Sequence, residues 1–225
     1  KKVKSISIWI FIVPFAAINT CLILITNFHE LFPNKEHIIG FTIPYIDGGA
    51  SISRTARVFP TYLIFKPAMF LTAYLLIRYW LYIKKIILNI HGEHKNLRKI
   101  LIFGIGSAIC LVIHSIFLGI KFDYDLYKLF RRVIMLIFII FEVVAQAYLV
   151  ITFYSIKNKL LEFINLKFLK LKAILVSFLV FVMIVSIPIV SMPGNKHIKH
   201  ALEWDFFLGV ILFYVLTFFM WKKQN

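Results

Sequence analysis

Long apolar runs constrain the fold of this chain more than any other feature. Of its 225 residues, 61% are hydrophobic and only 16% are charged, which is too apolar for a soluble domain of this size. A bilayer core of about 30 Å needs about 20 mostly apolar residues per helix, and unpaired backbone groups are too costly in hydrocarbon for strands or loops to span it. The sequence therefore predicts an all-α, polytopic membrane protein. We expect a six-transmembrane-helix bundle with spans at about 6–25, 61–83, 100–120, 133–156, 173–192 and 203–221.

The six runs and their connections predict a single membrane domain over residues 1–225. With the N-terminus in the cytoplasm, the inner segments hold fifteen Lys and Arg residues and the outer segments hold ten. Because positive charge gathers on the cytoplasmic side, we expect both termini to be cytoplasmic. The first run follows KKVK, as in a signal peptide, but it contains Asn19 and lacks a small-x-small cleavage site. We therefore expect it to be a retained span.

The formal net charge of +16 belongs mainly to the inner face, because seven of the ten acidic residues lie in outer segments. Inner Lys residues are expected to contact anionic lipid headgroups. The cations are spread over several loops without a soluble domain, which excludes nucleic acid binding. Lys157–Lys172, KNKLLEFINLKFLKLK, spaces Lys among apolar residues. This spacing predicts an amphipathic helix on the cytoplasmic surface, with a plain basic connector as the alternative.

The stretch HIKHALEWD, residues 197–205, gathers polar side chains just before the last apolar run. On a helix, His197, His200 and Glu203 share one face. Such a row could bind a metal or provide an acid and a base. The alternative is a structural helix start, in which Glu203 and Asp205 meet the positive end of the helix dipole and Trp204 lies at the membrane interface. We favour the helix start, expect no metal, and keep His200 and Glu203 as candidate catalytic residues.

Two polar groups lie deeper in the predicted spans. Glu142 is about nine residues inside the outer end of the fourth span, and His114 is about six residues inside the outer end of the third. At 1.5 Å per residue the two side chains lie at similar depth and could meet. An intramembrane carboxyl indicates a functional site with a partner, although a protonated Glu that bonds neighbouring helices is an equal alternative. Glu142 and His114 are therefore further catalytic candidates.

Cofactor and enzyme motifs are missing. The sequence holds no GxSxG, HExxH, Walker A or dinucleotide-binding pattern, and neither Cys21 nor Cys110 belongs to a CxxC pair. We expect no cofactor, no metal and no disulfide.

Two short motifs, SISRTARVFPTYLIF over residues 51–65 and HALEWDFF over residues 200–207, resemble those of the Frag/DRAM/Sfk family of six-span membrane proteins. SISRTARVFPTYLIF, residues 51–65, is similar to a family motif of Ile-Ser, an acid, Thr-Gly, then Pro and a hydrophobic-Phe pair. HALEWDFF, residues 200–207, is similar to the Ala-x-x-Glu-Trp that opens the last family span, although one residue and not two separates Ala201 from Glu203. The matching positions are Ile52, Ser53, Thr55, Pro60, Ile64, Phe65, Ala201, Glu203, Trp204 and Thr217. Arg54 replaces the family's acid and Ala56 its Gly; Asp47 could supply the missing charge.

The resemblance implies a DRAM-like protein that recognises membrane lipid from the outer or lumenal leaflet. Its implied roles are lipid remodelling, including that of GPI anchors, lipid asymmetry or autophagy, in the Golgi, the lysosome or the plasma membrane. We expect a shallow pocket beneath the first outer loop with His114 and Glu142 at its base, and Arg54 or Arg57 as the ionic partner of Glu203. The candidate lipid-binding residues are Ser53, Arg54, Thr55, Arg57, Pro60, Phe65, Glu203, Trp204 and Asp205.

Two other functions stay open. A lipid acyltransferase or hydrolase would use His200 or His114 as base and Glu203 or Glu142 as its partner. A small proton-coupled transporter would rely on Glu142 and His114. The sequence does not decide whether the protein is an enzyme.

Overall fold

The fold is a bundle of long helices, as the sequence predicts. The computed structural model describes residues 2–120, 125–192 and 194–222, and no strand occurs in these ranges. Within these ranges six α-helices are long, and three others have only four or five residues. The helices are α1 Lys2–Asn27, α2 Pro44–Asp47, α3 Ile52–Ala56, α4 Tyr62–His91, α5 Leu97–Phe117, α6 Asp125–Ser155, α7 Lys157–Leu160, α8 Leu166–Ser191 and α9 Lys196–Met220.

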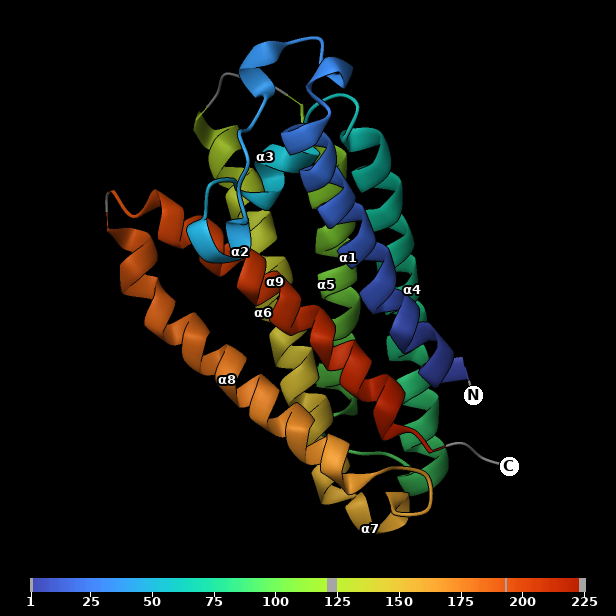
Figure 1. Cartoon of the computed structure of the whole chain (residues 1–225). Helices are drawn as coiled ribbons and strands as arrows, with labels where there is room; N and C mark the ends of the chain where they lie inside the picture. The colour runs from blue at the N-terminus through green and yellow to red at the C-terminus, as the bar shows by residue number, and fades with distance from the viewer. Residues whose placement is uncertain (1, 121–124, 193, 223–225) are drawn as a thin grey trace.

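The long helices alternate in direction, so the two ends of the bundle differ (Figure 1). The upper end, in the orientation of Figure 1, holds α2, α3 and the segment that joins α1 to α4. The lower end holds both chain termini and α7. Termini at the same end are what an even number of long helices requires.

Five helices are long and apolar enough to cross a membrane: α1, α5, residues 129–155 of α6, residues 166–188 of α8, and α9. α4 is not one of the five, although its 30 residues make it longer than α5. Its Tyr, Trp, Lys and Arg residues lower its mean hydropathy. α4 nevertheless packs between α1 and α5.

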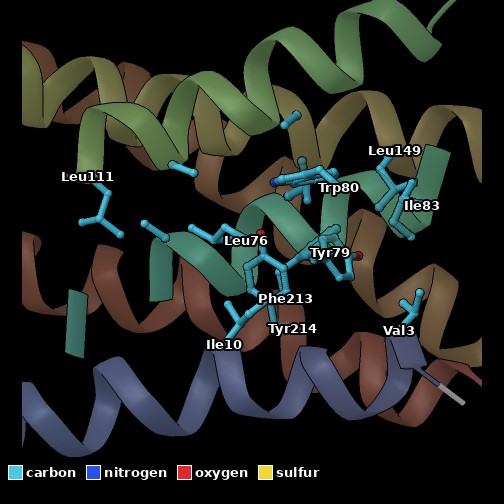
Figure 2. Close-up of a cluster of buried hydrophobic side chains, with 14 of the residues drawn as sticks. Val3, Ile10, Leu76, Tyr79, Trp80, Ile83, Leu111, Leu149, Phe213 and Tyr214 are labelled. Carbon is cyan, nitrogen blue, oxygen red and sulfur yellow. The ribbon is translucent and has the colours of Figure 1, made fainter. Parts of the chain in front are cut away.

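The centre of the bundle is filled with large aromatic side chains (Figure 2). Tyr79 of α4 packs edge-to-face on Trp80 and on Tyr214 of α9, with ring centroids 5.0 Å apart in both pairs. A Cβ on Gly104 of α5 would lie 2.5 Å from the Trp80 ring. Glycine at position 104 therefore allows α5 to approach α4 over the indole.

The predicted surface helix Lys157–Lys172 is wrong. α7 ends at Leu160, and α8 begins after Asn165, whose side chain accepts a hydrogen bond from the backbone N–H of Lys167. Lys172 belongs to α8, and its side chain is fully buried against α9. The segment therefore divides into a turn at the lower end and the first two turns of a long helix.

The expected start of the last helix at residue 203 is also wrong. α9 begins at Lys196, so Glu203 lies two turns inside it and Asp205 lies further along. Neither carboxyl is in the first turn, where the helix dipole would stabilise it.

Candidate functional site: a central cavity with charged residues at its upper end

A cavity of about 470 Å³ lies between α1, α4, α5, α6 and α9. Most of the residues that line it are apolar. Along each long helix the lining residues recur every three or four positions, as expected for one face of a helix. Met135, Ile139 and Glu142 line it from α6, and Phe207 and Tyr214 line it from α9. This volume falls within the range of about 300–1,000 Å³ that is typical of ligand pockets.

Charged and polar side chains line the upper part of the cavity. Arg57 lies directly after α3, Arg131 and Arg132 lie in the second turn of α6, and His114 lies near the end of α5. The Nδ1 atom of His114 and the Nε atom of Arg131 are buried without a hydrogen-bond partner among the described residues. These two atoms are enclosed by the protein, whereas the side chains of Arg57, Arg131, Arg132 and His114 line the cavity.

Glu142 lies at the lower part of the cavity and is almost fully buried. Its carboxyl accepts hydrogen bonds from Ser107 Oγ of α5 at 2.6 Å, from Gln146 Nε2 at 3.2 Å and from the Tyr214 hydroxyl of α9. Gln146 Nε2 also donates to the carbonyl of Val210 at 3.2 Å. These bonds join α5, α6 and α9 below the apolar part of the cavity.

The expected pairing of His114 with Glu142 does not occur. Glu142 is bonded to Ser107, which precedes His114 by seven residues, about 10 Å along α5. His114 instead faces the backbone of Arg131. Arg131 and Glu142 are eleven residues apart on α6, about 16 Å. His114 and Glu142 therefore line different levels of the cavity.

Glu203 fixes α3 at the upper end of the cavity. Its carboxyl faces the backbone N–H groups of Ile52 and Ser53, and the Ser51 hydroxyl caps the same short helix by accepting from Arg54 N–H at 3.2 Å. The expected ionic partnership of Glu203 with Arg54 or Arg57 does not form between these described residues. Glu203 therefore helps to position Arg57, which directly follows α3, through the backbone of that helix and not through an ion pair.

Gly119 holds Arg57 from the other side. Its φ is +86°, and a Cβ there would lie 2.8 Å from the Arg57 carbonyl oxygen. The chain beyond α5 therefore packs directly on the end of α3, and residue 119 favours glycine for both reasons.

A second, more polar pocket lies beside the central cavity at the upper end and shares Arg57 with it. We call it the upper pocket; its volume is about 340 Å³. The other residues that line it are Glu36, His37, Ser51, Arg54, Val58, Lys196 and His200.

The HIKHALEWD stretch anchors the segment that contains α2. Nδ1 of His197 lies 3.2 Å from the Asp47 carbonyl oxygen, and Nδ1 of His200 lies 2.9 Å from that of Gly48. Trp204 is fully buried and donates from Nε1 to the Ala50 carbonyl at 2.8 Å. The first turns of α9 therefore bind the backbone of residues 47–50.

The candidate lipid-binding residues lie in different parts of the structure, and only some of them line a pocket. Ser53, Arg57, Phe65 and Glu203 line the central cavity, and Arg54 lines the upper pocket. Thr55 and Trp204 are fully buried and bond to backbone carbonyls, and Asp205 is exposed on α9. Pro60 lies in the turn before α4 and lines neither pocket.

The candidate catalytic residues are not joined to one another. No hydrogen bond links His200, Glu203, His114 and Glu142 within the ranges that the structure describes, and each has the separate surroundings given above. Among the same residues, no group of three or more His, Cys, Asp or Glu is placed to hold a metal ion.

Sequence reasoning missed Arg131, Arg132 and Tyr214 as lining residues. The spacing in the sequence does indicate Arg131 as a lining residue. It precedes Glu142 by eleven residues, three helical turns, and so lies on the same face of the helix. The predicted fourth span begins at residue 133, whereas α6 begins at Asp125 and includes both arginines.

Comparison with known proteins gives no match: no family model, no curated protein and no solved structure is similar to this chain.

Proposed function

We propose that this chain is an integral multi-pass membrane protein that binds a membrane lipid, with an acyl chain in the central cavity and the headgroup at the upper end. The observation that carries the proposal is the cavity itself, apolar along α6 and α9 and charged only toward its ends. Arg131 and Glu142 are eleven residues apart, about 16 Å along α6. This depth and wall suit an alkyl chain.

In this proposal α4 is the sixth span, and the upper end faces the outer or lumenal side. α4 packs between α1 and α5, both apolar enough to cross a membrane. Arg78 donates to the hydroxyls of Tyr74 and Tyr82, which lie on the same helix. Such local pairing reduces the cost of a cation on a membrane helix. Exposed lysines at the lower end, including Lys84, Lys85 and Lys159, would contact anionic headgroups of the cytoplasmic leaflet.

The resemblance to the Frag/DRAM/Sfk family supports a cellular role for this binding. It favours lipid remodelling, lipid asymmetry or autophagy, at the Golgi, the lysosome or the plasma membrane. Ser53 and Glu203, two of the residues that carry the resemblance, line the central cavity.

Binding is favoured over catalysis by the surroundings of the candidate acids and bases. A general base needs to be within hydrogen-bond reach of its partner, whereas His200 bonds to the Gly48 carbonyl and Glu142 accepts from three donors. An acyltransferase or hydrolase would need these contacts to be exchanged.

The proposal is tested by filling the cavity. Met69 of α4 lines it and is 3% exposed, so Met69→Trp places a bulky ring in the space available to an alkyl chain. We expect the wild type to bind a fluorescent single-chain lipid saturably in nanodiscs, and Met69→Trp to bind it at least about ten-fold more weakly. Release of labelled acyl chains, measured in the same samples, tests the enzyme alternative.

The matched control is Leu71→Trp on the same helix, because Leu71 is 46% exposed and does not line the cavity. It should bind like the wild type. Val210→Phe, which enters the cavity from α9, guards against misfolding caused by a single variant. Unchanged saturable binding in both cavity variants would exclude the central cavity as the lipid site.

A further inference from the structure

Three arginines meet at the upper part of the central cavity. Arg57 comes from the end of α3, and Arg131 and Arg132 come from α6. We call these three residues the arginine cluster. Partial burial lowers the pKa of Arg57, and the positive charges of Arg131 and Arg54 lower it further. Arg57 therefore lies in a field of like charge.

The acids on the cavity wall are engaged elsewhere. Glu203 faces the backbone N–H groups of α3, and Glu142 lies about 16 Å below Arg131 with three donors of its own. The Arg131 guanidinium lies 5.5 Å from the centroid of the Tyr127 ring, a cation–π contact. Its Nε nevertheless stays buried without a hydrogen-bond partner among the described residues.

His114 supplies a second, independent observation. It is 8% exposed and lines the cavity beside Arg131, and its Nδ1 atom has no partner among the described residues. Leaving a buried polar atom unpaired is costly. The charged side chains that line the cavity here are those of Arg57, Arg131 and Arg132, and His114 adds a polar wall beside them.

The chemistry of a ligand bound here follows from these groups. Guanidinium groups present planar pairs of N–H donors that match phosphate oxygens. Arg131 and Arg132 directly precede the long apolar run of α6, which begins at Val133. This position corresponds to the interfacial layer of a bilayer, where lipid phosphates lie.

We propose that the arginine cluster and His114 bind the phosphate of a phosphate-bearing lipid whose acyl chain occupies the central cavity. This inference rests on the proposed function and adds the headgroup class. The same chemistry would accept free phosphate, so the test compares the two sources.

The experiment measures binding of four probes to the full chain in nanodiscs made of zwitterionic lipid. Three probes carry the same acyl chain: a lysophosphatidic acid, a lysophosphatidylcholine and a monoacylglycerol. The fourth is inorganic phosphate. We expect lysophosphatidic acid to bind at least about ten-fold more tightly than monoacylglycerol, because charge-assisted hydrogen bonds are the strong ones. Inorganic phosphate alone should bind more weakly than lysophosphatidic acid.

Two variants assign the phosphate contact. Arg131→Gln and Arg57→Gln should each weaken lysophosphatidic acid about ten-fold and leave monoacylglycerol unchanged, so retained monoacylglycerol binding shows that the variant is folded. Arg98→Gln is the matched control, because Arg98 is exposed at the lower end of α5. It should change neither affinity.

The outcomes separate the two proposals. Equal affinity for lysophosphatidic acid and monoacylglycerol would overturn the phosphate site and leave the lipid cavity standing. If inorganic phosphate binds as tightly as lysophosphatidic acid, the phosphate site is supported, but the acyl chain contributes nothing to the affinity and the lipid part of the proposal is overturned. Failure of every probe to bind the wild type would overturn both proposals.

Discussion

At the scale of single residues, Glu142 is a structural acceptor as much as a functional candidate. It gathers donors from α5, α6 and α9 at one level of the bundle. Interhelical hydrogen bonds in membrane proteins average only about 0.6 kcal/mol each. Two of the three bonds on this carboxyl are interhelical, and they matter mainly because they fix the positions of α5 and α9 against α6 around the cavity.

Lys172 is the second buried ionisable residue whose role can be tested. Its Nζ donates to Thr217 Oγ1 at 2.8 Å and lies 3.8 Å from the centroid of the Phe213 ring. Burial of a cation costs free energy that one hydroxyl and one ring do not fully offset. Lys172→Met keeps the length of the side chain and removes its charge. Its free energy of unfolding in detergent should therefore be at most about 1 kcal/mol below that of the wild type, or above it.

Lys170→Met is the matched control for Lys172, because Lys170 is exposed two residues earlier on α8. Thermal unfolding should show no change for this variant. A clear loss of thermal stability in Lys172→Met alone would mean that the Lys172–Thr217 contact contributes more than the burial of its charge costs.

Site residues that are polar within an apolar span could be predicted from the sequence. Site residues whose position depends on packing against distant parts of the chain were harder to predict. Glu142 and His114 stand out in the sequence because polar groups within an apolar span need a reason. The buried role of Trp204 could not be predicted, because its partner is the carbonyl of Ala50, 154 residues earlier. A contact to a distant backbone atom leaves no local pattern.

At the scale of elements, the docking of α2 on α9 organises the upper end. Ala50 O accepts from Trp204, and the ring of Tyr45 packs edge-on against the same indole at 4.9 Å. The Tyr45 hydroxyl also donates to Asn19 Oδ1 of α1 at 3.1 Å. The segment before α3 is therefore tied to the first and the last long helix.

The turn around α2 should loosen in acid because of Asp47. Its carboxylate accepts from Thr42 Oγ1 at 2.5 Å, Gly49 N at 2.8 Å and Ile43 N at 2.9 Å. These bonds, with a smaller contribution from the charge of His197, lower the pKa of Asp47. The stabilisation is complete above the unfolded pKa of about 3.9 and is lost as pH falls through the lower folded value.

A nitroxide on Ile46→Cys reports this loosening, because Ile46 is 81% exposed and the label disturbs no packing. With Cys21 and Cys110 replaced by Ser, the label should stay ordered from pH 7 to pH 5 and become mobile below about pH 4. Asp47→Ala should be mobile already at pH 7, whereas Asp205→Ala, on the exposed side of α9, should match the parent. A label that is as ordered in Asp47→Ala as in the parent at pH 7 would contradict this role of Asp47.

Helix type and number follow from the apolar runs, but helix bounds do not. The long helices extend past the apolar windows at one end or both; α6 begins at Asp125 and α9 at Lys196, seven or eight residues before the predicted spans. Hydropathy detects contact with lipid, whereas a helix continues for as long as its backbone bonds and tertiary contacts are satisfied. The added turns carry Arg131, Arg132 and His200.

At the scale of the whole molecule, the helices differ in how much of their surface faces outward. α8 packs on α6 and α9 and exposes Ile174, Phe178, Phe181 and Ile184, each at 59% or more. Figure 1 shows α8 at one side of the bundle. An apolar exposed face of this kind is what contact with lipid requires, and it lies on the side away from α4.

The number of crossings depends on α4, and one labelling experiment decides it. Glu36 and Glu93 are both exposed, and α4 is the long helix between them. If α4 crosses the membrane, Glu36→Cys and Glu93→Cys should react with an impermeant maleimide from opposite sides of sealed vesicles. At 1.5 Å per residue its 30 residues span about 45 Å, which exceeds the bilayer core of about 30 Å.

Lys159→Cys provides the internal reference for this topology. It is separated from Glu93 by α5 and α6, so two crossings should return it to the side of Glu93. The excess of Lys and Arg at the lower end predicts that this shared side is the cytoplasm. Labelling of Glu36→Cys from the same side as Glu93→Cys would remove α4 from the membrane.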